Sequence, residues 1–357
     1  MASESRSASD RFGHARWSEV AAMVGPALLL FAAFVLLPFV MSVAFSFSNV
    51  KLLQAEPVQG VGLDNYTRMF ALKVIAAPPV ANDTEAQIPS RQWRRLKRLQ
   101  PAPFEGYQYL TKVSLGGSAW LIGARDPQFL RSVANTFLFA LLVVPLQTTL
   151  ALAMALWVNQ RFRGRVLLRT VFFSPVVTSM VVVAALWGLV LHTDVGVANQ
   201  VLRALWGAHA PQPDWLGDPH IAMLSIAIMS AWQGAGFQML IFLSGLQSIG
   251  YDQYEAADVM GASRWQKFIY ITLPGLRRTV VFVLASTTIM ALGLFTQVDV
   301  LTSGGPRDST STIIFHAVRV GFREQDIAYG AAMTLVFFLI VLLLSLGQKI
   351  LMRKEGA

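Results

Sequence analysis

The residues of this chain that could do chemistry fall into two groups. The first is a short polar run carrying both signs of charge, centred on Glu255 and Arg264, between two long apolar stretches. A charged connector on the face of a membrane protein is a natural docking site for a soluble partner. The second group consists of hydroxyl and amide side chains within the apolar stretches, which suit a neutral ligand rich in hydroxyl groups.

The members of this second group are Thr178, Ser179, Ser230, Gln233, Gln238, Ser286, Thr287, Thr288 and Gln297. The competing interpretation is that such side chains bond to their own helix or hold neighbouring helices together. The residues alone leave both interpretations open.

The composition places both groups in a membrane protein. The chain has 357 residues, is 54% hydrophobic and only 14% charged, and has a mean hydropathy of +0.51, whereas soluble domains carry roughly 25% charged residues. The net charge of +9 does not indicate nucleic-acid binding, because the basic residues lie at the ends of apolar stretches. The lack of cysteine excludes disulfides, thiolate metal sites and cysteine nucleophiles.

Six apolar windows without Asp, Glu, Lys or Arg are each long enough for a membrane-spanning helix, which takes roughly 20 residues. The windows are Val20–Val50, Ser132–Gln160, Thr170–Thr193, Pro219–Tyr251, Thr279–Val298 and Ile327–Gln348. The first window is too long for a signal peptide and lacks a cleavage site of small residues. We therefore expect an all-α integral membrane protein with six transmembrane helices.

The distribution of Lys and Arg predicts that both termini are cytoplasmic. Basic residues crowd the two tails and the connections after the second and fourth spans, whereas the loop 194–218 holds one Arg against three Asp. Positive charge favours the cytoplasmic side. The predicted order is a cytoplasmic tail at 1–18, a first span at 19–48, an external segment at 49–128, a core of five spans at 129–350 and a cytoplasmic tail at 351–357.

The external segment contains an insert, residues 71–124, with its own sequence character. It holds a basic run at 91–98 and an alternating stretch, Tyr107–Val113, which predicts a short strand ending at Gly116-Gly117. We expect a small extracytoplasmic cap that contains β-structure. The alternative is a flexible loop that lies on anionic lipid headgroups.

Nothing in the chain indicates that it supplies its own energy or catalysis. No Asp, Glu, Lys or Arg lies deep within a span, whereas proton- and ion-coupled carriers usually keep intramembrane carboxylates or histidines. The sequence also has no phosphate-binding G-x-x-x-x-G-K-[ST] loop, no dinucleotide fingerprint and no recognisable Ser-His-Asp or paired-carboxylate arrangement. We predict a non-catalytic protein without a metal or cofactor of its own, driven by another chain.

The polar run predicts two short helices at an angle, which we call the plug (residues 250–270). Gly250 can end the preceding span, Gly261 allows a sharp change of direction, and Leu273-Pro274 restarts a membrane helix, since Pro is acceptable in a first turn. A plug of this kind transmits force only if it fits rigidly into a groove of its partner. Polarity alone would equally suit a solvated connector.

The spacing of the run decides between these interpretations. From Glu255 to Pro274 the chain reads E-A-A-x3-G-x9-I-x-L-P. This pattern resembles, at every fixed position, the cytoplasmic signature of permease subunits of bacterial binding-protein-dependent ABC importers. Further stretches resemble the carbohydrate class, and within it the F-type permease of maltose transporters. These stretches are Gly62–Tyr66, Asp299–Pro306, Ser309–Thr312 and Ala328–Ala332. Together the resemblance covers roughly 20–70 and 125–352.

The resemblance implies a type I permease fold in the bacterial inner membrane and a place in a larger complex. In that family the loop is a coupling helix that inserts into a cleft of the ATPase subunit. The residues that it assigns to coupling are Glu255, Ala256, Ala257, Asp258, Gly261 and Arg264. The implied partners are a second homologous permease, two ATPase subunits that use ATP and Mg, a periplasmic solute-binding protein, a neutral sugar and the lipid bilayer, but no nucleic acid.

The resemblance also implies a sugar site midway across the membrane. The matching residues are Thr178, Ser179, Ser230, Gln233, Gly234, Phe237, Met290, Leu294 and Gln297. Gln233 would bond sugar hydroxyls, Gly234 would allow close approach, and Phe237 would cover apolar C–H surfaces. Val176 and Leu294 are aliphatic where the maltose pattern is polar or aromatic, so maltose itself is not implied. The loop Gly304-Gly305-Pro306 and the insert resemble surfaces that meet the binding protein.

The predicted function is that of a transmembrane permease subunit of an ATP-driven sugar importer that works by alternating access. Permeases for a polyol, glycerol phosphate or an amino acid are the nearer alternatives. A stand-alone secondary carrier is the more distant one.

Overall fold

The computed structural model describes residues 17–53, 57–76, 89–99, 101, 104–115, 118–160 and 162–355. Most of the predicted tail 1–18 and the Gly116-Gly117 strand end lie outside the described residues. The tail predicted from 351 onward is helical as far as Glu355, because the last helix continues without a break from Ile327.

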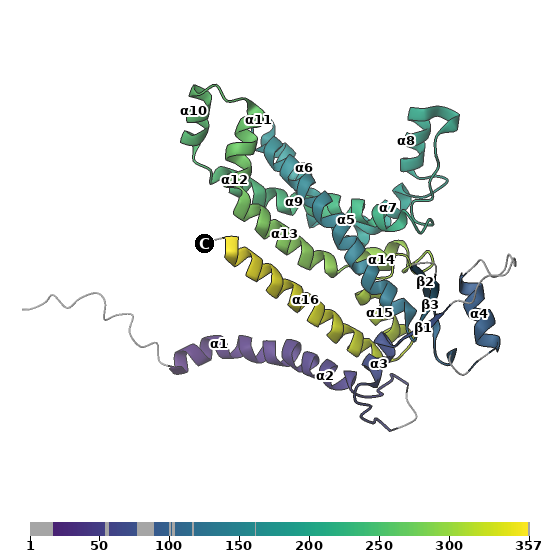
Figure 1. The fold of residues 1–357 in the computed structure, drawn as a ribbon. Helices are drawn as coiled ribbons and strands as arrows, with labels where there is room; N and C mark the ends of the chain where they lie inside the picture. The colour runs from purple at the N-terminus through teal and green to yellow at the C-terminus, as the bar shows by residue number, and fades with distance from the viewer. Residues whose placement is uncertain are drawn as a thin grey trace, which may run out of the picture.

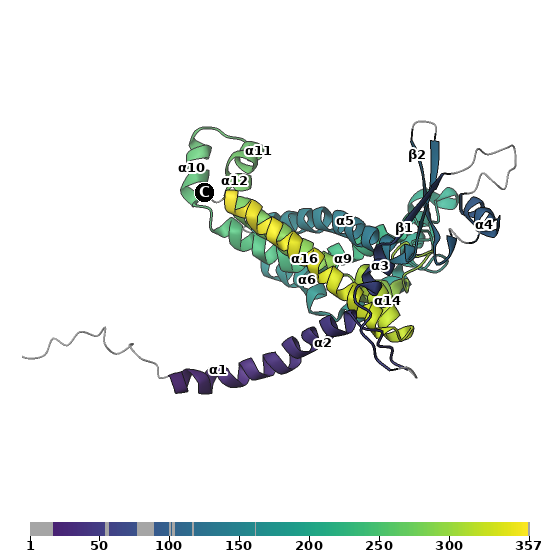
Figure 2. The ribbon, with the colours of Figure 1, turned by 60° about the horizontal axis from the view of Figure 1, so that its bottom comes forward.

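Long helices run side by side between two ends of the molecule (Figures 1 and 2). One end carries the plug and the C-terminus, and the other carries the strands. The helices of the body are α5 (Pro127–Val158), α6 (Arg165–Val177), α7 (Met180–Val190), α9 (Ala222–Gln247), α12 (Leu273–Gly275), α13 (Arg277–Leu292) and α16 (Ile327–Glu355).

Shorter elements connect these helices. They are α3 (Asp64–Phe70), α8 (Val197–Trp206), a 3-10 turn (Gly207–His209), α10 (Tyr251–Val259), α11 (Arg264–Lys267), a π-helical segment (Phe268–Thr272), α14 (Thr296–Leu301), α15 (Ile313–Val318) and a second π-helical segment (Arg319–Arg323).

Four helices in the described ranges are long and apolar enough to cross a membrane, or up to six if each of two bent pairs forms one span. The first bent pair, Arg165–Val177 with Met180–Val190, turns by 100°, and the second, Arg264–Gly275 with Arg277–Leu292, turns by 65°. The sequence prediction of six spans agrees with this larger number. It did not specify that the third and fifth spans are broken.

The first half of the first span stands apart from the other helices (Figures 1 and 2), whereas its second half packs against α16, where the rings of Phe39 and Phe338 meet edge to face at 5.2 Å. It consists of α1 (Trp17–Phe31), a π-helical segment (Ala32–Leu36) and α2 (Leu37–Ser46). The wide turn immediately precedes Pro38, which lacks the N–H of a regular helix. The most apolar part of this span has no residue buried within the chain. Its apolar surface must therefore be covered by lipid or by another protein.

The core lies along the contact between α5 and α9. Small residues such as Ala151, Ala155 and Ala235 are fully buried there, because they let helix backbones approach closely. Gly236 of α9 extends this close packing to α6: a Cβ at this position would lie 2.2 Å from the carbonyl oxygen of Phe172. Larger side chains such as Met239 and Phe242 fill the remaining space in this contact.

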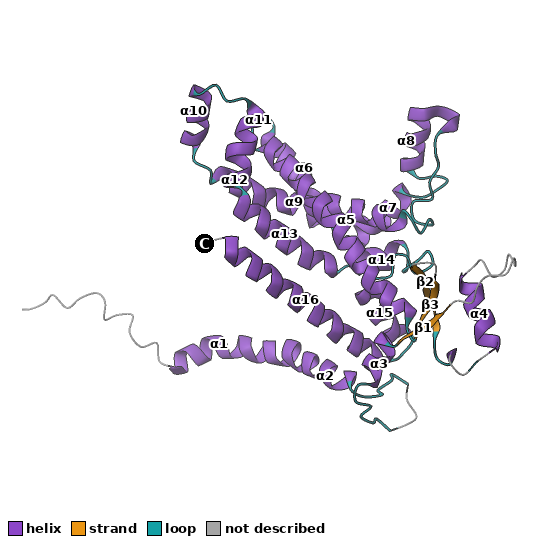
Figure 3. Cartoon of the chain, in the orientation of Figure 1, coloured by secondary structure: helices purple, strands orange, loops and turns teal. Residues whose placement is uncertain are grey.

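The insert forms a three-stranded antiparallel sheet with one helix packed on it (Figure 3). The strands are β1 (Leu72–Ala76), β2 (Gln108–Leu115) and β3 (Ser118–Ala124), in the order β1-β3-β2. The basic run forms α4 (Pro89–Leu99), whose Trp93 is buried against Phe104 and Leu121. The expected β-containing cap is therefore present, with three strands where the sequence predicted one.

Asp126 connects three helices, α5, α15 and α16, at the insert end of the bundle. Its carboxylate caps the start of α5 by accepting from the Phe129 N–H at 2.9 Å. It also accepts from the Tyr329 hydroxyl of α16 at 2.7 Å and lies 3.3 Å from His316 Nε2 of α15. Burial opposes the charge, but the hydrogen bonds from His316, Phe129 and Tyr329 outweigh it and lower the pKa of Asp126 to about 2.

Replacing Asp126 by Asn should destabilise this end of the bundle, because the neutral amide cannot accept all three bonds as strongly. We expect a loss of about 1–3 kcal/mol, measured as a lower thermal unfolding temperature of the purified protein in detergent. The carboxylate's contribution is fully present above the ordinary pKa of 3.8 and is lost as the pH falls through about 2. The difference between wild type and variant should therefore shrink over this range.

Asp194→Asn is the matched control, because this exposed carboxylate accepts no side-chain hydrogen bond from another described residue. Its unfolding temperature should stay near that of wild type. Equal stabilities of wild type and Asp126→Asn near neutral pH would contradict the capping role.

Candidate coupling and translocation site

The plug folds as two short helices joined at a glycine. Gly250 precedes α10, and Gly261, with φ of +75°, turns the chain between α10 and α11 in a region that side chains with a Cβ rarely adopt. Ser263 then starts α11 with a capping box, in which its hydroxyl and backbone are both bonded to Gln266. The structure thus contains the two predicted short helices, and Gly261 forms the turn between them, as predicted.

Two side-chain contacts make the plug rigid. The Tyr254 hydroxyl of α10 lies 2.9 Å from the Thr272 hydroxyl, and Lys267 pairs with Asp258 across the turn. Each contact joins α10 to the segment after the turn and so restrains the angle between the two helices. A rigid body of this kind can move as a unit.

The outer surface of the plug is more apolar than its sequence suggests. Val259 and Met260 are 89% and 85% exposed, and Trp265 is 67% exposed. Glu255 is exposed on the same helix as Val259. Large exposed apolar side chains grouped beside charges are characteristic of an interaction surface. The other residues predicted for coupling lie in or next to this surface, with Ala257 half-buried; they are Ala256, Ala257, Asp258, Gly261 and Arg264.

Two broken helices meet α9 near the middle of the chain's membrane body. The α6–α7 pair bends at Thr178, which is extended, and Ser179, and a second interruption, distinct from the bend between α12 and α13, lies where α13 ends at Leu292 shortly before α14 begins. Carbonyl groups freed by such breaks need partners, because lipid supplies none. One turn of α9 provides contacts to both breaks.

Gln233 bonds a freed carbonyl at the first break, whereas at the second the Leu294 carbonyl accepts from the Thr312 hydroxyl at 2.7 Å and Ser230 contacts only a side chain. Gln233 Nε2 donates to the carbonyl oxygen of Pro175 at 3.4 Å, just before the α6–α7 bend. The Ser230 hydroxyl accepts from Gln297 Nε2 of α14 at 3.5 Å. The structure thus brings Ser230, Gln233 and Gln297 close to the two breaks, with Thr178 and Ser179 exposed beside the first.

Phe237 lies on the accessible side of α9. It lines an open groove of about 600 Å³ between α9 and α13, together with the hydroxyl-bearing residues Ser244, Ser248 and Thr279. Its side chain is 49% exposed, and Met290 of α13 is 68% exposed. A groove that combines aromatic and hydroxyl groups suits contact with a sugar. The groove also holds Arg278, a cation close to the plug end of α13.

The structure gives two predicted pathway residues a different role. Leu294 is 3% exposed and belongs to the hydrophobic core between α5, α9 and α14, so it packs within the chain. At Gly234 a Cβ would lie 2.3 Å from the amide nitrogen of Gln147 in α5. Gly234 therefore leaves space for the Gln147 side chain of the neighbouring helix α5.

The Gly304-Gly305-Pro306 loop is held tightly against the body. Gly304 has φ of +84°, and a Cβ there would lie 2.5 Å from the ring of Phe315. The Thr310 hydroxyl donates to the Gly305 carbonyl at 2.6 Å. Gly304 is buried and Gly305 and Pro306 are half-buried, whereas the next residue, Arg307, is exposed. A partner that meets this loop would thus meet a preformed surface.

Most of the chain matches a known protein family. Residues 119–355 match the family described as "Binding-protein-dependent transport system inner membrane component". The chain belongs to this family. The permease is therefore a multi-pass membrane subunit of a binding-protein-dependent transport system, and it is a non-catalytic transport subunit.

Individual relatives agree with this assignment. The permease is 34% identical to the trehalose/maltose transport system permease protein MalF of Thermococcus litoralis over 230 residues, covering 64% of this chain and 76% of the relative. It is 27% identical to the sulfoquinovosyl glycerol transport system permease protein SmoG of Agrobacterium fabrum over 316 residues, covering 88% and 84%.

A solved structure shares the fold along nearly the whole chain. It is the crystal structure of a bacterial ABC transporter involved in the import of the acidic polysaccharide alginate, with a TM-score of 0.68 and 20% sequence identity. The similarity covers 95% of the permease and 96% of that chain, so it includes the region of the insert.

Sequence reasoning missed several residues that shape the site. Gln147 follows Pro145 within α5 and fills the space at Gly234. It could have been found in the sequence as an isolated amide side chain in an apolar helix. The exposed apolar side chains of the plug, Val259, Met260 and Trp265, were not among the residues assigned to coupling. The Asp126 cluster was not found, because its members are far apart in the sequence.

Gly236→Ala should separate α6 from α9 and so disturb the first break. The added Cβ would meet the backbone carbonyl of Phe172, which cannot rotate away, and overpacking of this kind costs about 1–3 kcal/mol. We expect a lower thermal unfolding temperature in detergent. Gly347→Ala in α16 is the matched control, because a Cβ there has no atom within 4 Å and alanine favours a helix. Indistinguishable behaviour of the two variants would contradict the close contact.

Proposed function

We propose that this chain is the permease subunit of an ATP-driven sugar importer and forms half of its translocation pathway. The observation that carries the proposal is the rigid plug, which joins two helices lining an open groove. The sugar class is supported by relatives that are named as permeases for lactose, trehalose or maltose, and arabinooligosaccharides. It is also supported by the amide, hydroxyl and aromatic groups on α9.

The plug is proposed as the part that seats in a partner ATPase, which binds ATP and Mg. Val259, Met260 and Trp265 offer apolar surface for a protein groove, and Glu255 adds a charge beside them. Burial of such side chains provides most of the binding energy of a typical interface. The plug end of the molecule, with the C-terminus beside it, would then lie on the cytoplasmic side of a bacterial inner membrane.

Continuity of the chain supports alternating access. The plug follows α9 directly at Gly250 and leads through the π-helical segment into α12 and α13. Closure of the ATPases would displace the plug as a rigid body and move α9 and α13 together, because both are covalently joined to it. The two breaks bonded to α9 would be carried along, and the groove would open toward one side at a time.

A second homologous permease is the proposed cover for the open surfaces. The groove between α9 and α13 is open, so one chain cannot enclose a pathway. The first span has an unburied apolar surface that an adjacent subunit would cover. The Gly304–Pro306 loop and the insert lie at the opposite end from the plug, where a periplasmic binding protein would deliver sugar.

Glu255→Lys and Gly261→Asp test the coupling role. The first reverses a charge on the exposed face, and the second places a side chain at φ of +75°. We expect both variants to insert normally but to lose more than about 90% of sugar uptake and of transport-linked ATP hydrolysis, since loss of rigid seating removes about 1.4 kcal/mol or more of coupling. Uptake into proteoliposomes and ATPase activity of the reconstituted complex are the measurements.

Asp194→Lys provides a charge-reversal control at an exposed position in the external loop 194–218. It should retain uptake and ATPase activity. Normal uptake by Glu255→Lys and Gly261→Asp together would overturn the assignment of the plug to coupling.

A further inference from the structure

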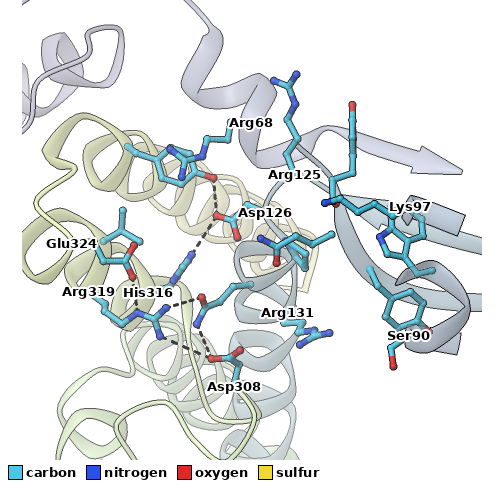
Figure 4. A pocket seen from close by; sticks show the side chains of 18 of the residues that line it. Arg68, Ser90, Lys97, Arg125, Asp126, Arg131, Asp308, His316, Arg319 and Glu324 are labelled. Carbon is cyan, nitrogen blue, oxygen red and sulfur yellow. Dashed lines mark hydrogen bonds and ion pairs between the residues drawn. The ribbon is translucent and has the colours of Figure 1, made fainter. Parts of the chain in front are cut away.

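A pocket of about 610 Å³ lies where the insert meets the bundle (Figure 4). One wall comes from α4 and β2 of the insert, and the other from the start of α5, the Arg319–Arg323 segment and the start of α16. The pocket opens beside Asp126, the residue that precedes the apolar span Pro127–Val158. Its volume falls within the roughly 300–1,000 Å³ of small-molecule sites, and it is separate from the groove between α9 and α13.

The charge in this pocket is unbalanced. Six Arg and Lys side chains line it, against three carboxylates. Each carboxylate already has a partner: Asp126 accepts from Tyr329 at 2.7 Å, Asp308 accepts from Gln128 at 2.7 Å, and Glu324 pairs with Arg319 at 3.1 Å. The three carboxylates are therefore already bonded to other residues of the bundle.

Four of the cations pair with no described carboxylate. These residues are Arg94, Lys97, Arg125 and Arg131. Arg94 and Lys97 each reach only a backbone carbonyl, at 3.4 Å, and Arg125 lies over the ring of Tyr107 at 5.8 Å. Figure 4 shows Arg131 extending from α5 toward the side of the pocket that holds Ser90 and Lys97. Most of their N–H donors remain available.

The gathering of like charges makes this pocket attractive to anions. Each exposed cation alone is well solvated, but several cations in one concave site reinforce each other's potential and concentrate anions there. Guanidinium groups recognise carboxylate, sulfate and phosphate with paired hydrogen bonds. Tyr107 and Tyr109 add aromatic surface to the same pocket, which suits the apolar face of a sugar ring.

We propose that this pocket binds an anionic saccharide through its carboxylate, sulfonate, sulfate or phosphate group. Arg94, Lys97, Arg125 and Arg131 hold the acidic group, and the tyrosines contact the ring. The saccharide nature of the ligand rests on the proposed function, whereas the anionic requirement rests on the pocket itself. The ligand is held at the insert before it reaches the groove of the membrane body.

Direct binding to the full chain tests this site without transport. The chain in phosphatidylcholine nanodiscs is titrated at low salt with glucuronate, glucose 6-sulfate and glucose 6-phosphate, with glucose as the neutral probe. We expect at least one acidic probe to bind about tenfold or more tightly than glucose, and this preference to weaken as salt is added. Equal binding of the acidic probes and glucose overturns the proposal.

Substitution of the basic side chains shows whether the acidic probe binds in this pocket. The double variant Lys97→Gln/Arg131→Gln should lose the preference for the acidic probe, whereas Arg131→Lys should keep most of it. Arg98→Gln on the same helix is the matched control, because Arg98 is exposed and does not line the pocket; it should bind as wild type does. A preference that survives in the double variant overturns the proposal, and size-exclusion behaviour like that of wild type confirms that each variant is folded.

Two further measurements distinguish an anionic saccharide from other partners that could meet the same cations. If phosphatidylglycerol in the nanodiscs abolishes binding of the acidic probe, the occupant is a lipid headgroup and the saccharide assignment is overturned. The assignment is also overturned if the double variant weakens only the docking of the binding protein. Sugar uptake by the wild-type complex is measured in parallel: its absence counts against the proposed function, whereas uptake without acidic-probe binding counts against this pocket alone.

Discussion

The structure depends on one constraint, which is that backbone polar groups in hydrocarbon must find partners inside the protein. A straight helix meets this constraint by itself, but α6–α7 and α13–α14 do not, because each is interrupted. Gln233 compensates at the first interruption by bonding the Pro175 carbonyl, and the Ser230–Gln297 contact ties the second to the same turn of α9. Through these contacts both interruptions are connected to one helix, and at the second the Thr312 hydroxyl supplies the bond to the Leu294 carbonyl.

Much of the architecture follows from patterns visible in the sequence. Uncharged windows of sufficient length indicated the spans, because charge is costly in lipid. The glycine at position 261 indicated the corner of the plug, because few other residues adopt its backbone conformation. The spacing from Glu255 to Pro274 indicated the family, which the match over 119–355 confirms. These signals are local, and each is set by the residue itself or by its near neighbours.

The parts that escaped prediction depend on contacts between distant segments. Whether Gly234 admits a ligand or a helix is decided by Gln147, which lies on another span. Leu294 is buried because side chains of α5, α9 and α15 pack around it, which hydropathy alone does not reveal. The carboxylate of Asp126 meets His316 and Tyr329 only in the folded chain. The basic run 91–98 was visible in the sequence, but its meeting with Arg125 and Arg131 required the sheet.

The isolated position of α1, the first half of the first span, has a consequence for how this sequence can vary. No described side chain of α1 is buried within the chain, so the fold of this subunit places little restriction on the side chains of α1 beyond their hydrophobicity and length. Whatever covers that helix supplies the remaining restriction. Substitutions along α1 should accordingly be correlated across species with residues of the covering molecule, if it is a protein, and should be nearly independent of residues in α5, α9 and α13.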